Sequence, residues 1–433
     1  MEKYLNIWKF LKNRFQFFKQ KTALVCGSER ISYAQLTEIV EQGGKQRKIL
    51  PVLEGSLAEQ AISILKGLRR ENIVVPLNKA YGENYCQNIF SELEKHNAND
   101  MDSDIALILF TSGSTGKPKG AMLSHENVIS NLRAIGGYFE IDETDKMLIA
   151  RPLMHCAVLT GEFLYGLYKG AEIHLYGESF MPRRIVRYIA AQGITVFGAT
   201  PTLLHLLLPS FLNEDARVLQ KIVVSGEILS AAHAERFAAA FPEADIYSVY
   251  GLTEASPRVA ALPPKMFASK YGSIGKPIEN VELRLEGERQ CEGRLFVRSP
   301  GIMRGYLGNE SLTKQKIVGG WLDTGDIARR DADGYYYILG RADGMIIRSG
   351  INIYPEEMET LLKQDERVRE CLFYAENDGA LGKRLCVKMA AEITKEEAFE
   401  ICAAKLPSFA RPQKIEIVGS LLKTASGKVR RSV

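Results

Sequence analysis

Apolar and polar positions follow two different periods along the chain. From 4 to 18, apolar residues recur at intervals of three and four, which predicts an amphipathic helix. We expect this helix to dock on the protein body; the alternative is a helix that lies on a membrane surface. The apolar positions are Tyr4, Ile7, Trp8, Leu11, Phe15 and Phe18.

Short apolar runs alternate with helical stretches between 104 and 255. Helical segments such as 181–192 and 231–241 separate the runs. Repetition of strand, helix and strand predicts a parallel sheet flanked by helices, with ligands beyond the carboxyl ends of the strands. The strands expected are 105–110, 147–150, 171–176, 195–199, 221–224 and 246–249.

The pattern changes after about residue 270. Short strands are expected at 281–285, 294–297 and 335–339, separated by Gly, Pro, Asn and Asp turns. The C-terminal part carries one strand–helix alternation and ends in a basic segment. The predicted fold class is therefore α/β: a large N-terminal domain of parallel-rich sheets flanked by helices, a small β-rich unit, and a small α+β C-terminal domain.

Composition excludes several classes of protein. The chain has 433 residues, of which 46% are apolar and 25% charged, so it is neither disordered nor collagen-like. A net charge of +4 is too weak to indicate nucleic acid or an anionic membrane as partner. No apolar run reaches the ~18 residues of a membrane span. Seven scattered cysteines without a CxxC pair fit reduced thiols, so we expect a cytoplasmic protein without a zinc site.

The segment TSGSTGKPKG at 111–120 follows an expected strand. It holds three glycines, four hydroxyl residues and two lysines. Glycines let several backbone N–H groups converge, while hydroxyls and lysines add donors and positive charge, which suits a polyphosphate. It is not a Walker A loop, because Pro118 follows Gly116 and Lys117. The alternative interpretation is a flexible surface turn.

This segment resembles the phosphate loop of the adenylate-forming superfamily, which contains acyl- and aryl-CoA synthetases, firefly luciferase and the adenylation domains of peptide synthetases. Further segments resemble motifs of that superfamily in the same order, and the resemblance covers the chain from about residue 22 onward. They are RPLMH at 151–155, ATPTLL at 199–204, SGE at 225–227, YGLTE at 250–254, DTGD at 323–326, GRAD at 340–343 and SGK at 426–428.

The resemblance implies two domains, a large adenylation domain at 1–341 and a small, mobile lid domain at 342–433 with its hinge at Asp343. The large domain would bind the acid and ATP, and the small one would carry the catalytic Lys428. After the adenylate forms, the small domain would rotate and present the segment 349–352 to the incoming thiol.

The resemblance also implies a role for each matched residue. Catalysis would fall to Lys428, Thr253, Glu254, Arg341 and His155, with Glu254 as the Mg²⁺ ligand. For His155, a core histidine with satisfied hydrogen bonds is the alternative. ATP would contact Thr111, Ser112, Gly113, Ser114, Thr115, Gly116, Lys119, Ser225, Gly226, Glu227, Tyr250, Gly251, Asp326 and Arg341. The acid pocket would be lined by His155, Val158, Gly161, Ala199, Ser225, Gly251 and Ser256.

The implied reaction joins two anions. A carboxylate attacks the α-phosphorus of ATP and expels pyrophosphate, so the site must align both reactants and neutralise the charge that builds up. The acyl group then passes to a thiol. The implied cofactors are ATP, Mg²⁺ and coenzyme A, or the phosphopantetheine of an acyl carrier protein.

Two segments of the sequence narrow the choice of substrate acid and of acyl acceptor. No acidic residue lies between His155 and Glu162, so a buried ammonium group would lack a partner. This disfavours an amino acid and leaves an aryl or medium acyl acid. Residues 348–359 resemble the GxNIYPxEIE form of acyl- and aryl-CoA ligases, which favours coenzyme A. The alternatives are a stand-alone adenylation enzyme that loads a carrier protein, and a non-catalytic ATP- or acyl-binding protein on the same fold.

The N-terminal part is shorter than is usual for the superfamily, since Pro76 lies only 35 residues before Thr111. We expect some peripheral elements to be missing there, with effects on the acid pocket, on coenzyme A binding and on oligomeric contacts. The identity of the acid and the oligomeric state, with a homodimer as one option, stay open at this point.

Overall fold

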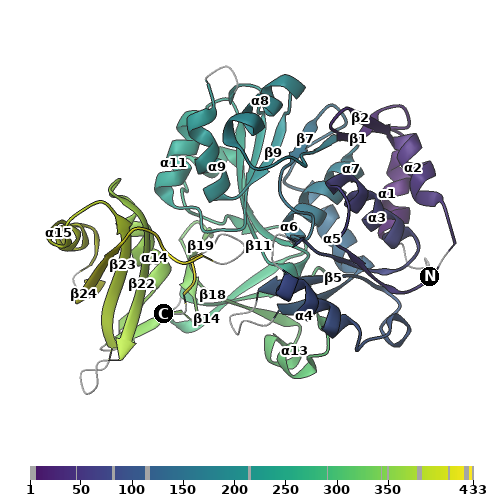
Figure 1. Cartoon of the computed structure of the whole chain (residues 1–433). Coiled ribbons are helices and arrows are strands. Elements are labelled where there is room, and N and C mark those ends of the chain that lie inside the picture. Colours follow the sequence, from purple (N-terminus) through teal and green to yellow (C-terminus); the bar gives the residue numbers. More distant parts are fainter. Residues whose placement is uncertain are drawn as a thin grey trace. The chain divides into compact units, whose positions relative to one another are not determined.

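The computed structural model groups the chain into two compact units (Figure 1). The first contains residues 1–283 and 297–322, and the second contains 284–296 and 323–433. The predicted domain boundary between 341 and 342 stays a prediction, because the units follow the packing of the chain and not its motion. The structure describes residues 6–44, 46–79, 83–112, 118–212, 216–289, 291–342, 344–348, 351–377, 383–407, 410–423 and 429–431.

A nine-stranded sheet forms the centre of the first unit, in the order β13-β12-β11-β10-β9-β7-β8-β1-β2. The six strands from β11 to β1 in this order run parallel, and β2 and β12 pair antiparallel with their neighbours. The predicted parallel sheet is therefore confirmed. Its strands are β1 (Thr22–Cys26), β2 (Glu29–Ser32), β7 (Lys146–Ile149), β8 (Glu172–Leu175), β9 (Val196–Ala199), β10 (Lys221–Val224), β11 (Asp245–Gly251), β12 (Arg258–Leu262) and β13 (Lys276–Pro277).

The strand expected at 105–110 belongs to a second sheet, which corrects the sequence analysis. It becomes β5, which pairs parallel with β4 and antiparallel with β6, in the order β16-β6-β5-β4-β3. An apolar run predicts a strand but not its partner, and here the chain returns directly in β6. The strands are β3 (Ile49–Val52), β4 (Ile73–Pro76), β5 (Ile105–Ser112), β6 (Pro118–Ser124) and β16 (Gly305–Tyr306).

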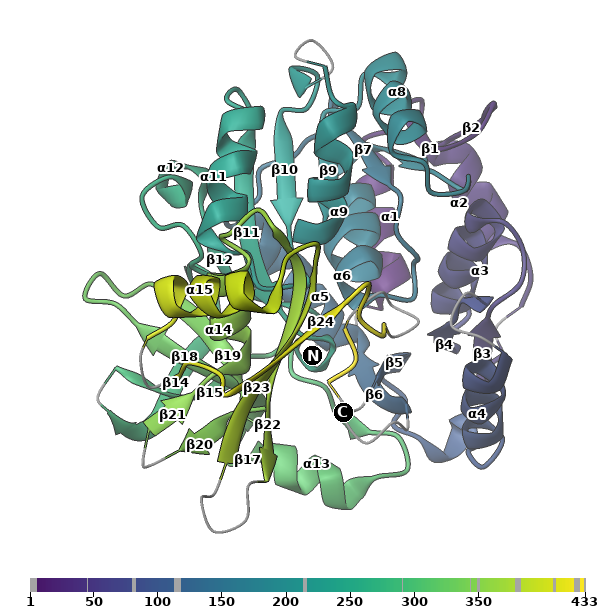
Figure 2. The same ribbon diagram turned by 60° about the vertical axis from the view of Figure 1, so that its left-hand side comes forward.

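Helices surround both sheets of the first unit. Helices α8, α9 and α11 lie around β9 in both views, and Figure 2 shows β10 between α11 and α9 (Figure 1 and Figure 2). The predicted helices at 181–192 and 231–241 are thereby confirmed. The helices are α1 (Ile7–Phe15), α2 (Tyr33–Glu41), α3 (Leu57–Arg69), α4 (Glu83–Leu93), α5 (His125–Gly136), α6 (Cys156–Val158), α7 (Tyr165–Lys169), α8 (Pro182–Gln192), α9 (Pro201–Leu207), α11 (Ala231–Ala240), α12 (Pro264–Phe267) and α13 (Glu310–Lys316).

Helix α1 docks on the first unit, as the sequence predicts. Asn6 caps it by accepting a hydrogen bond from Lys9 N at 2.8 Å, and Trp8 Nε1 donates to Glu41 Oε1 at 2.8 Å. Burial of each large apolar side chain contributes roughly 1.5–3 kcal/mol. The membrane-surface alternative is wrong for this helix, because its apolar face is buried in the core. The buried residues are Ile7, Trp8, Phe10, Leu11 and Phe15.

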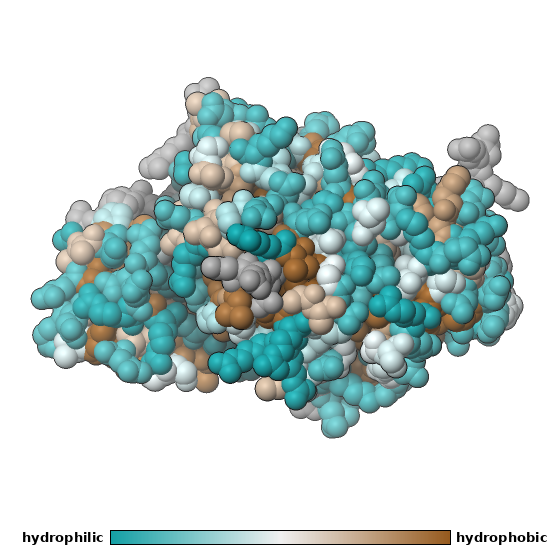
Figure 3. All heavy atoms as spheres, turned by 90° about the horizontal axis from the view of Figure 1, so that it is seen from above, coloured by the Kyte–Doolittle hydropathy of each residue, from teal (hydrophilic) through white to brown (hydrophobic). Residues whose placement is uncertain are grey.

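Large apolar side chains lie mainly in the interior. The face drawn in Figure 3 is mostly hydrophilic, with hydrophobic residues in small groups. Phe17, Leu212 and Leu422 are among the few large apolar side chains that stay exposed. Within the described ranges, no helix combines the length and the apolar character that crossing a membrane requires.

The second unit contains the short strands and the α+β part. Strand β15 pairs with β14 and β18, and β19 pairs with β18. A separate sheet β22-β23-β24 shares one core with α14 and α15, which confirms the predicted α+β character. The elements are β14 (Glu282–Arg289), β15 (Glu292–Arg298), β18 (Trp321–Arg330), β19 (Tyr336–Arg341), β20 (Ile346–Arg348), β21 (Ile351–Ile353), α14 (Pro355–Leu362), β22 (Val368–Asn377), β23 (Lys383–Ala391), α15 (Lys395–Lys405) and β24 (Lys414–Val418).

Candidate active site

Several predicted site residues of the first unit meet at the carboxyl edge of the parallel strands. Ala199 ends β9, Ser225 follows β10, and Gly251 ends β11. Ser225 N donates a hydrogen bond to Ala199 O at 3.0 Å, which joins two of these positions directly. Ligands of open α/β sheets bind at this edge, so the structure brings these residues to the expected place.

Glu254 lies just beyond this edge, on the short 3₁₀ turn η5 (Thr253–Ala255). Tyr306 Oη donates a hydrogen bond to Glu254 Oε1 at 2.8 Å, and Met303 N donates to Glu254 O at 2.9 Å. Tyr306 lies on β16, which pairs with β6. The carboxylate is thus fixed beside the sheet that carries the glycine-rich segment, and it is a hard oxygen donor of the kind that Mg²⁺ prefers.

Two paired antiparallel strands, β5 and β6, flank the glycine-rich segment in the sequence. Thr111 and Ser112 complete β5, Lys119 belongs to β6, and Thr111 pairs with Lys119 across the ladder. The sequence analysis placed a loop over 111–120, but the strands extend further into it from both sides. Gly113, Ser114, Thr115 and Gly116 lie outside the described residues, so their predicted role at the phosphates stays a prediction.

The segment 225–227, expected to lie against adenine, is tied to helix α9. Glu227 Oε2 accepts hydrogen bonds from Thr202 N at 3.1 Å and from Thr202 Oγ1 at 2.6 Å. Glu227 therefore satisfies a free N–H of the first turn of α9. Gly226 follows Ser225 with a φ of +90°, and Tyr250 lies half-buried near the end of β11. Their nucleotide roles remain predictions.

The expected acid-pocket residues between 155 and 161 lie on irregular helix. His155 precedes α6 and is half-buried, Val158 is fully buried, and Gly161 lies on η3 (Leu159–Leu164), a π-helical stretch. Such stretches often occur at functional sites. Ser256 is different, because its Oγ donates to Gly301 O at 2.7 Å and therefore supports the turn after Glu254.

Cys156 lies beside His155 but cannot act as the acyl-accepting thiol. Burial raises the pKa of the Cys156 thiol to about 12. The reactive form of a cysteine is the thiolate, and a thiol with so high a pKa stays protonated near neutral pH. Cys156 is therefore not a candidate for the acyl-accepting thiol.

In the second unit, Asp326 and Arg341 form a cross-strand pair. They face each other in the register of β18 and β19, and Arg341 Nη1 lies 3.0 Å from Asp326 Oδ1. Arg341 Nη1 also donates to Thr324 O at 2.9 Å. The sequence predicts both residues at the ribose, and the structure places them together, while their contact with a nucleotide stays a prediction.

The catalytic lysine predicted at Lys428 lies outside the described residues, as do Asp343, Ser349 and Gly350. The flanks of the lysine segment meet in an antiparallel bridge between Lys423 and Val429. The adjacent Arg431 donates to both oxygens of Glu359, at 2.7 and 3.2 Å. Burial raises the pKa of Glu359, and Arg431 acts in the opposite direction. Arg431, three residues after Lys428, is thus tied to helix α14.

Three charged residues near the carboxyl edge received no site role from the sequence, although Arg151 lies in the RPLMH segment and Glu162 follows it; Arg258 was missed altogether. Arg151 and Glu162 form an ion pair, and Arg258 lies 3.8 Å from the same carboxylate. The sequence contained one signal for Arg258: this arginine is the first residue of a run that is otherwise apolar through Leu262. The fold and this edge define the class: an α/β protein whose ligand site lies at the carboxyl ends of its parallel strands.

Comparison with known families makes the class specific. The sequence pattern of the AMP-binding enzyme family matches residues 41–307, and the pattern of the AMP-binding enzyme C-terminal domain matches 357–428. The chain belongs to the AMP-binding enzyme family, which confirms the resemblance found in its motifs.

Curated relatives and solved structures agree with this assignment. The chain is 31% identical over 341 residues to feruloyl-CoA synthase of Amycolatopsis, covering 75% of this chain and 68% of that one. It is 31% identical over 340 residues to 2-succinylbenzoate–CoA ligase of Bacillus licheniformis, covering 76% and 69%. Its fold matches O-succinylbenzoate coenzyme A synthetase of Bacillus subtilis, solved with ATP and magnesium, with a TM-score of 0.85, 24% identity, and coverage of 99% and 98%.

Proposed function

We propose that this protein is an acid–thiol ligase that works in two steps. It activates a carboxylic acid with ATP to an acyl-adenylate, releases pyrophosphate, and transfers the acyl group to coenzyme A. The observation that carries the proposal is Glu254, fixed by Tyr306 beside the glycine-rich hairpin at the carboxyl edge. Membership of the AMP-binding enzyme family and relatives named as CoA ligases support it.

The residues of the first unit divide the work of adenylation. Glu254 would hold Mg²⁺, which when bound neutralises phosphate charge. Thr253 next to it would contact the phosphate, and Tyr250 would stack on adenine. Thr111 and Lys119, opposite each other in the hairpin, would flank the phosphates. Catalysis then consists of alignment and charge neutralisation, because the attacking carboxylate and ATP are both anions.

The second unit would supply ribose and transition-state contacts. Asp326 would accept hydrogen bonds from the ribose hydroxyls, with Arg341 beside it as a donor. Lys428 would bring positive charge to the bridging oxygens. The pair of Arg431 and Glu359 holds the C-terminal flank of the segment that contains Lys428.

An aryl acid is the substrate class that we favour. Feruloyl-CoA synthase and 2-succinylbenzoate–CoA ligase are both named for aryl acids. Glu162 is the acidic residue that could otherwise pair with a substrate ammonium group, but Arg151 donates to it. An amino acid would therefore find its nearest carboxylate already neutralised.

The test is a product analysis by mass spectrometry. The purified protein would be incubated with ATP, Mg²⁺ and a panel of aryl, medium-chain and dicarboxylic acids, with and without coenzyme A. We expect an acyl-adenylate without coenzyme A, and acyl-CoA with AMP when it is present. An adenylate that ignores coenzyme A but loads a phosphopantetheine carrier protein would overturn the acceptor. Formation of ADP, or no adenylate from any acid, would overturn the proposal itself.

A further inference from the structure

Three charged side chains lie buried at the carboxyl edge of the nine-stranded sheet. Arg258 and Glu162 are each 2% exposed, and Arg151 is 12% exposed. Arg151 Nη2 donates to Glu162 Oε1, and Arg258 Nη2 lies 3.8 Å from that same oxygen. One carboxylate therefore faces two guanidinium groups, and among the described residues the ion pairs leave this cluster with one net positive charge.

Several N–H donors of this cluster also lack a hydrogen-bond acceptor among the described residues. Arg258 Nε and Nη2, and Arg151 Nε, are buried without a hydrogen-bond partner in the part of the chain that the structure describes. An arginine cannot lose its proton, so the charge cannot be avoided by neutralisation. Burial of an unpaired charge is among the most costly arrangements in a protein interior. An apolar residue at 258, like those that follow it in β12, would avoid this cost.

The surrounding backbone is shaped to admit these side chains. Asn131 on α5 holds the backbone of Arg258, accepting from its N at 3.1 Å and donating to its O at 2.8 Å. A Cβ at Gly161 would come within 2.9–3.2 Å of the Arg258 guanidinium. A Cβ at Gly198 would come within 2.5–2.6 Å of the Glu162 carboxyl group. Glycine at both positions therefore leaves the charged groups their space.

The unpaired donors lie among the residues expected to form the acid pocket. Arg258 pairs with Gly251 in the register of β11 and β12, and its guanidinium packs on Gly161. Ser225, at the end of β10, also has a buried Oγ without a described partner. Buried donors on three chain segments therefore belong to, or lie next to, positions expected to line the acid pocket, and they suit an acceptor that carries negative charge.

We propose that Arg258, together with Arg151, binds a second carboxylate of the acid substrate, so that the protein prefers dicarboxylic acids. The inference rests on the proposed function and deepens it by naming the substrate class. Nε and Nη2 form one edge of the guanidinium, and a carboxylate accepts two parallel hydrogen bonds from such an edge. Binding would also cancel the uncompensated charge. A monocarboxylic acid would leave that charge unpaired.

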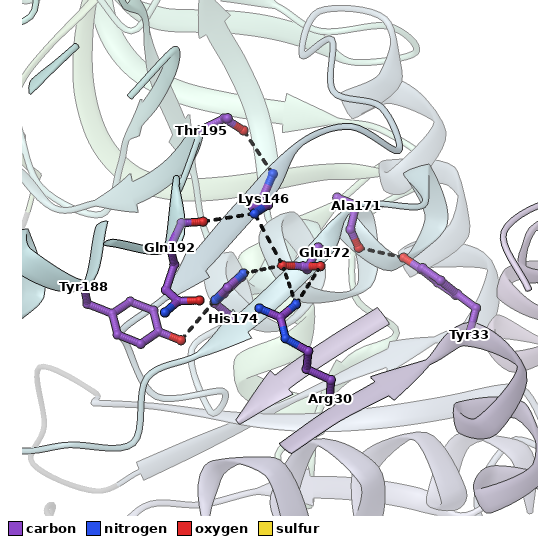
Figure 4. A network of polar contacts seen from close by, with 9 residues as sticks. All are labelled: Arg30, Tyr33, Lys146, Ala171, Glu172, His174, Tyr188, Gln192 and Thr195. Atoms are coloured by element: carbon purple, nitrogen blue, oxygen red, sulfur yellow. Dashed lines mark hydrogen bonds and ion pairs between the residues drawn. The ribbon is translucent and has the colours of Figure 1, made fainter. Parts of the chain in front are cut away.

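Calorimetric titration with matched acids tests this preference. Each pair would contain a monocarboxylate and a dicarboxylate of the same skeleton, such as hexanoate with adipate and benzoate with isophthalate. The proteins would be the wild type, R258M, R258K and the control R30M. Arg30 lies on the same sheet, is half-exposed, and faces Glu172 at 3.3 Å (Figure 4). R258K keeps the positive charge but loses the fork of donors.

We expect at least one dicarboxylate to bind the wild type about 10-fold or more tightly than its matched monocarboxylate, since hydrogen bonds to charged groups have that strength. R258M would abolish the preference, R258K would keep part of it, and R30M would keep all of it. No preference in any pair, or an unchanged preference in R258M, would overturn the inference. If R258M does not fold, R258K decides. Failure of the proposed function would show separately, as a bound acid that yields no adenylate with ATP.

Discussion

The two edges of the nine-stranded sheet differ in how completely their buried charged side chains are paired. At the amino edge, the buried carboxylate of Asp145 and the half-buried carboxylate of Glu172 have charged partners within the described chain. Asp145, just before β7, accepts from Lys221 Nζ at 2.8 and 3.0 Å. Glu172, at the start of β8, lies 2.8 Å from His174 Nε2 and 3.3 Å from Arg30 Nη1 (Figure 4). These charged groups therefore pair with one another within the chain and do not need a ligand as counterion.

At the carboxyl edge, pairing within the chain is incomplete. Arg151 and Arg258 share Glu162, and two nitrogens of Arg258 have no described partner. The Oγ of Ser225 is also buried without a described hydrogen-bond partner. The same strands carry both edges, so the difference does not come from the fold. We infer that charges at the amino edge stabilise the protein, whereas those at the carboxyl edge serve the proposed binding of a substrate carboxylate.

The largest effect should come from Glu254. We expect E254Q to lower the rate of acyl-adenylate formation by about 10²–10³-fold, because a neutral amide replaces the charge expected to hold Mg²⁺. Pyrophosphate release would be measured beside thermal unfolding, which should not change. The exposed Glu235 on α11 provides the control variant E235Q. Equal rates in E254Q and the wild type would remove Glu254 from the site.

The next largest effect tests the paired edge. We expect D145N to lower the free energy of unfolding by about 3 kcal/mol, because it leaves Lys221 without its counterion in a mostly buried site. Asp145 is 3% exposed and Lys221 is 19% exposed. Urea unfolding would measure the loss, and the double variant D145N/K221M should recover part of it. A loss of unfolding free energy no larger than that of an ordinary surface substitution would show that the paired charges at the amino edge do not stabilise the protein.

A smaller, pH-dependent effect should come from a buried group at neither edge. His125 Nδ1 accepts from Ile7 N at 3.2 Å, and burial lowers the pKa of His125 from 6.5 to about 4. The unfolded state therefore binds the proton more readily than the folded state. The stability that neutral His125 contributes is present above pH 6.5 and is lost as the pH falls toward 4.

We expect a loss of about 2 kcal/mol between pH 7.5 and pH 5 from this residue. Fluorescence of Trp8 during urea unfolding would report it in a W321F background, since the chain has two tryptophans. H125Q should show a weaker dependence on pH by the same amount. An identical pH dependence in H125Q would assign the effect to other groups.

The smallest effect should come from removal of the unmatched charge. We expect R258M to change the free energy of unfolding by less than about 1 kcal/mol, because Glu162 keeps Arg151 as its partner and an apolar side chain suits the buried site. Urea unfolding beside D145N gives the direct comparison. A loss as large as that of D145N would show that Arg258 is a structural residue, and the two edges would no longer differ.

Periodicity and motifs predicted a large part of this molecule. The strands of the parallel sheet and helix α1 follow from local patterns of burial, which the sequence records directly. Strand β5 shows the limit of such patterns. Its apolar run predicts a strand but fits either sheet, so the pattern does not predict the strand's partners. The assignment of β5 depends on β6, the next strand along the chain, which pairs antiparallel with it.

The candidate site shows the same limit. Motifs placed Ala199, Ser225 and Gly251, because each lies at or directly after the end of a strand that the pattern locates. Arg258 was missed, since its burial and its distance to Glu162 depend on how β12 packs on the helix around Gly161. Such juxtapositions depend on tertiary packing, which no local spacing records.

The central claim is attack of the acid's carboxylate oxygen on the α-phosphorus of ATP. An acid that the product analysis identifies as a substrate would be labelled with ¹⁸O in its carboxylate and turned over with ATP, Mg²⁺ and coenzyme A. Mass spectrometry of the AMP formed would then locate the label. The account predicts one ¹⁸O in the phosphate of AMP, because the bridging oxygen of the adenylate stays on phosphorus when the thiol attacks the acyl carbon. Unlabelled AMP, or label in inorganic phosphate, would contradict it.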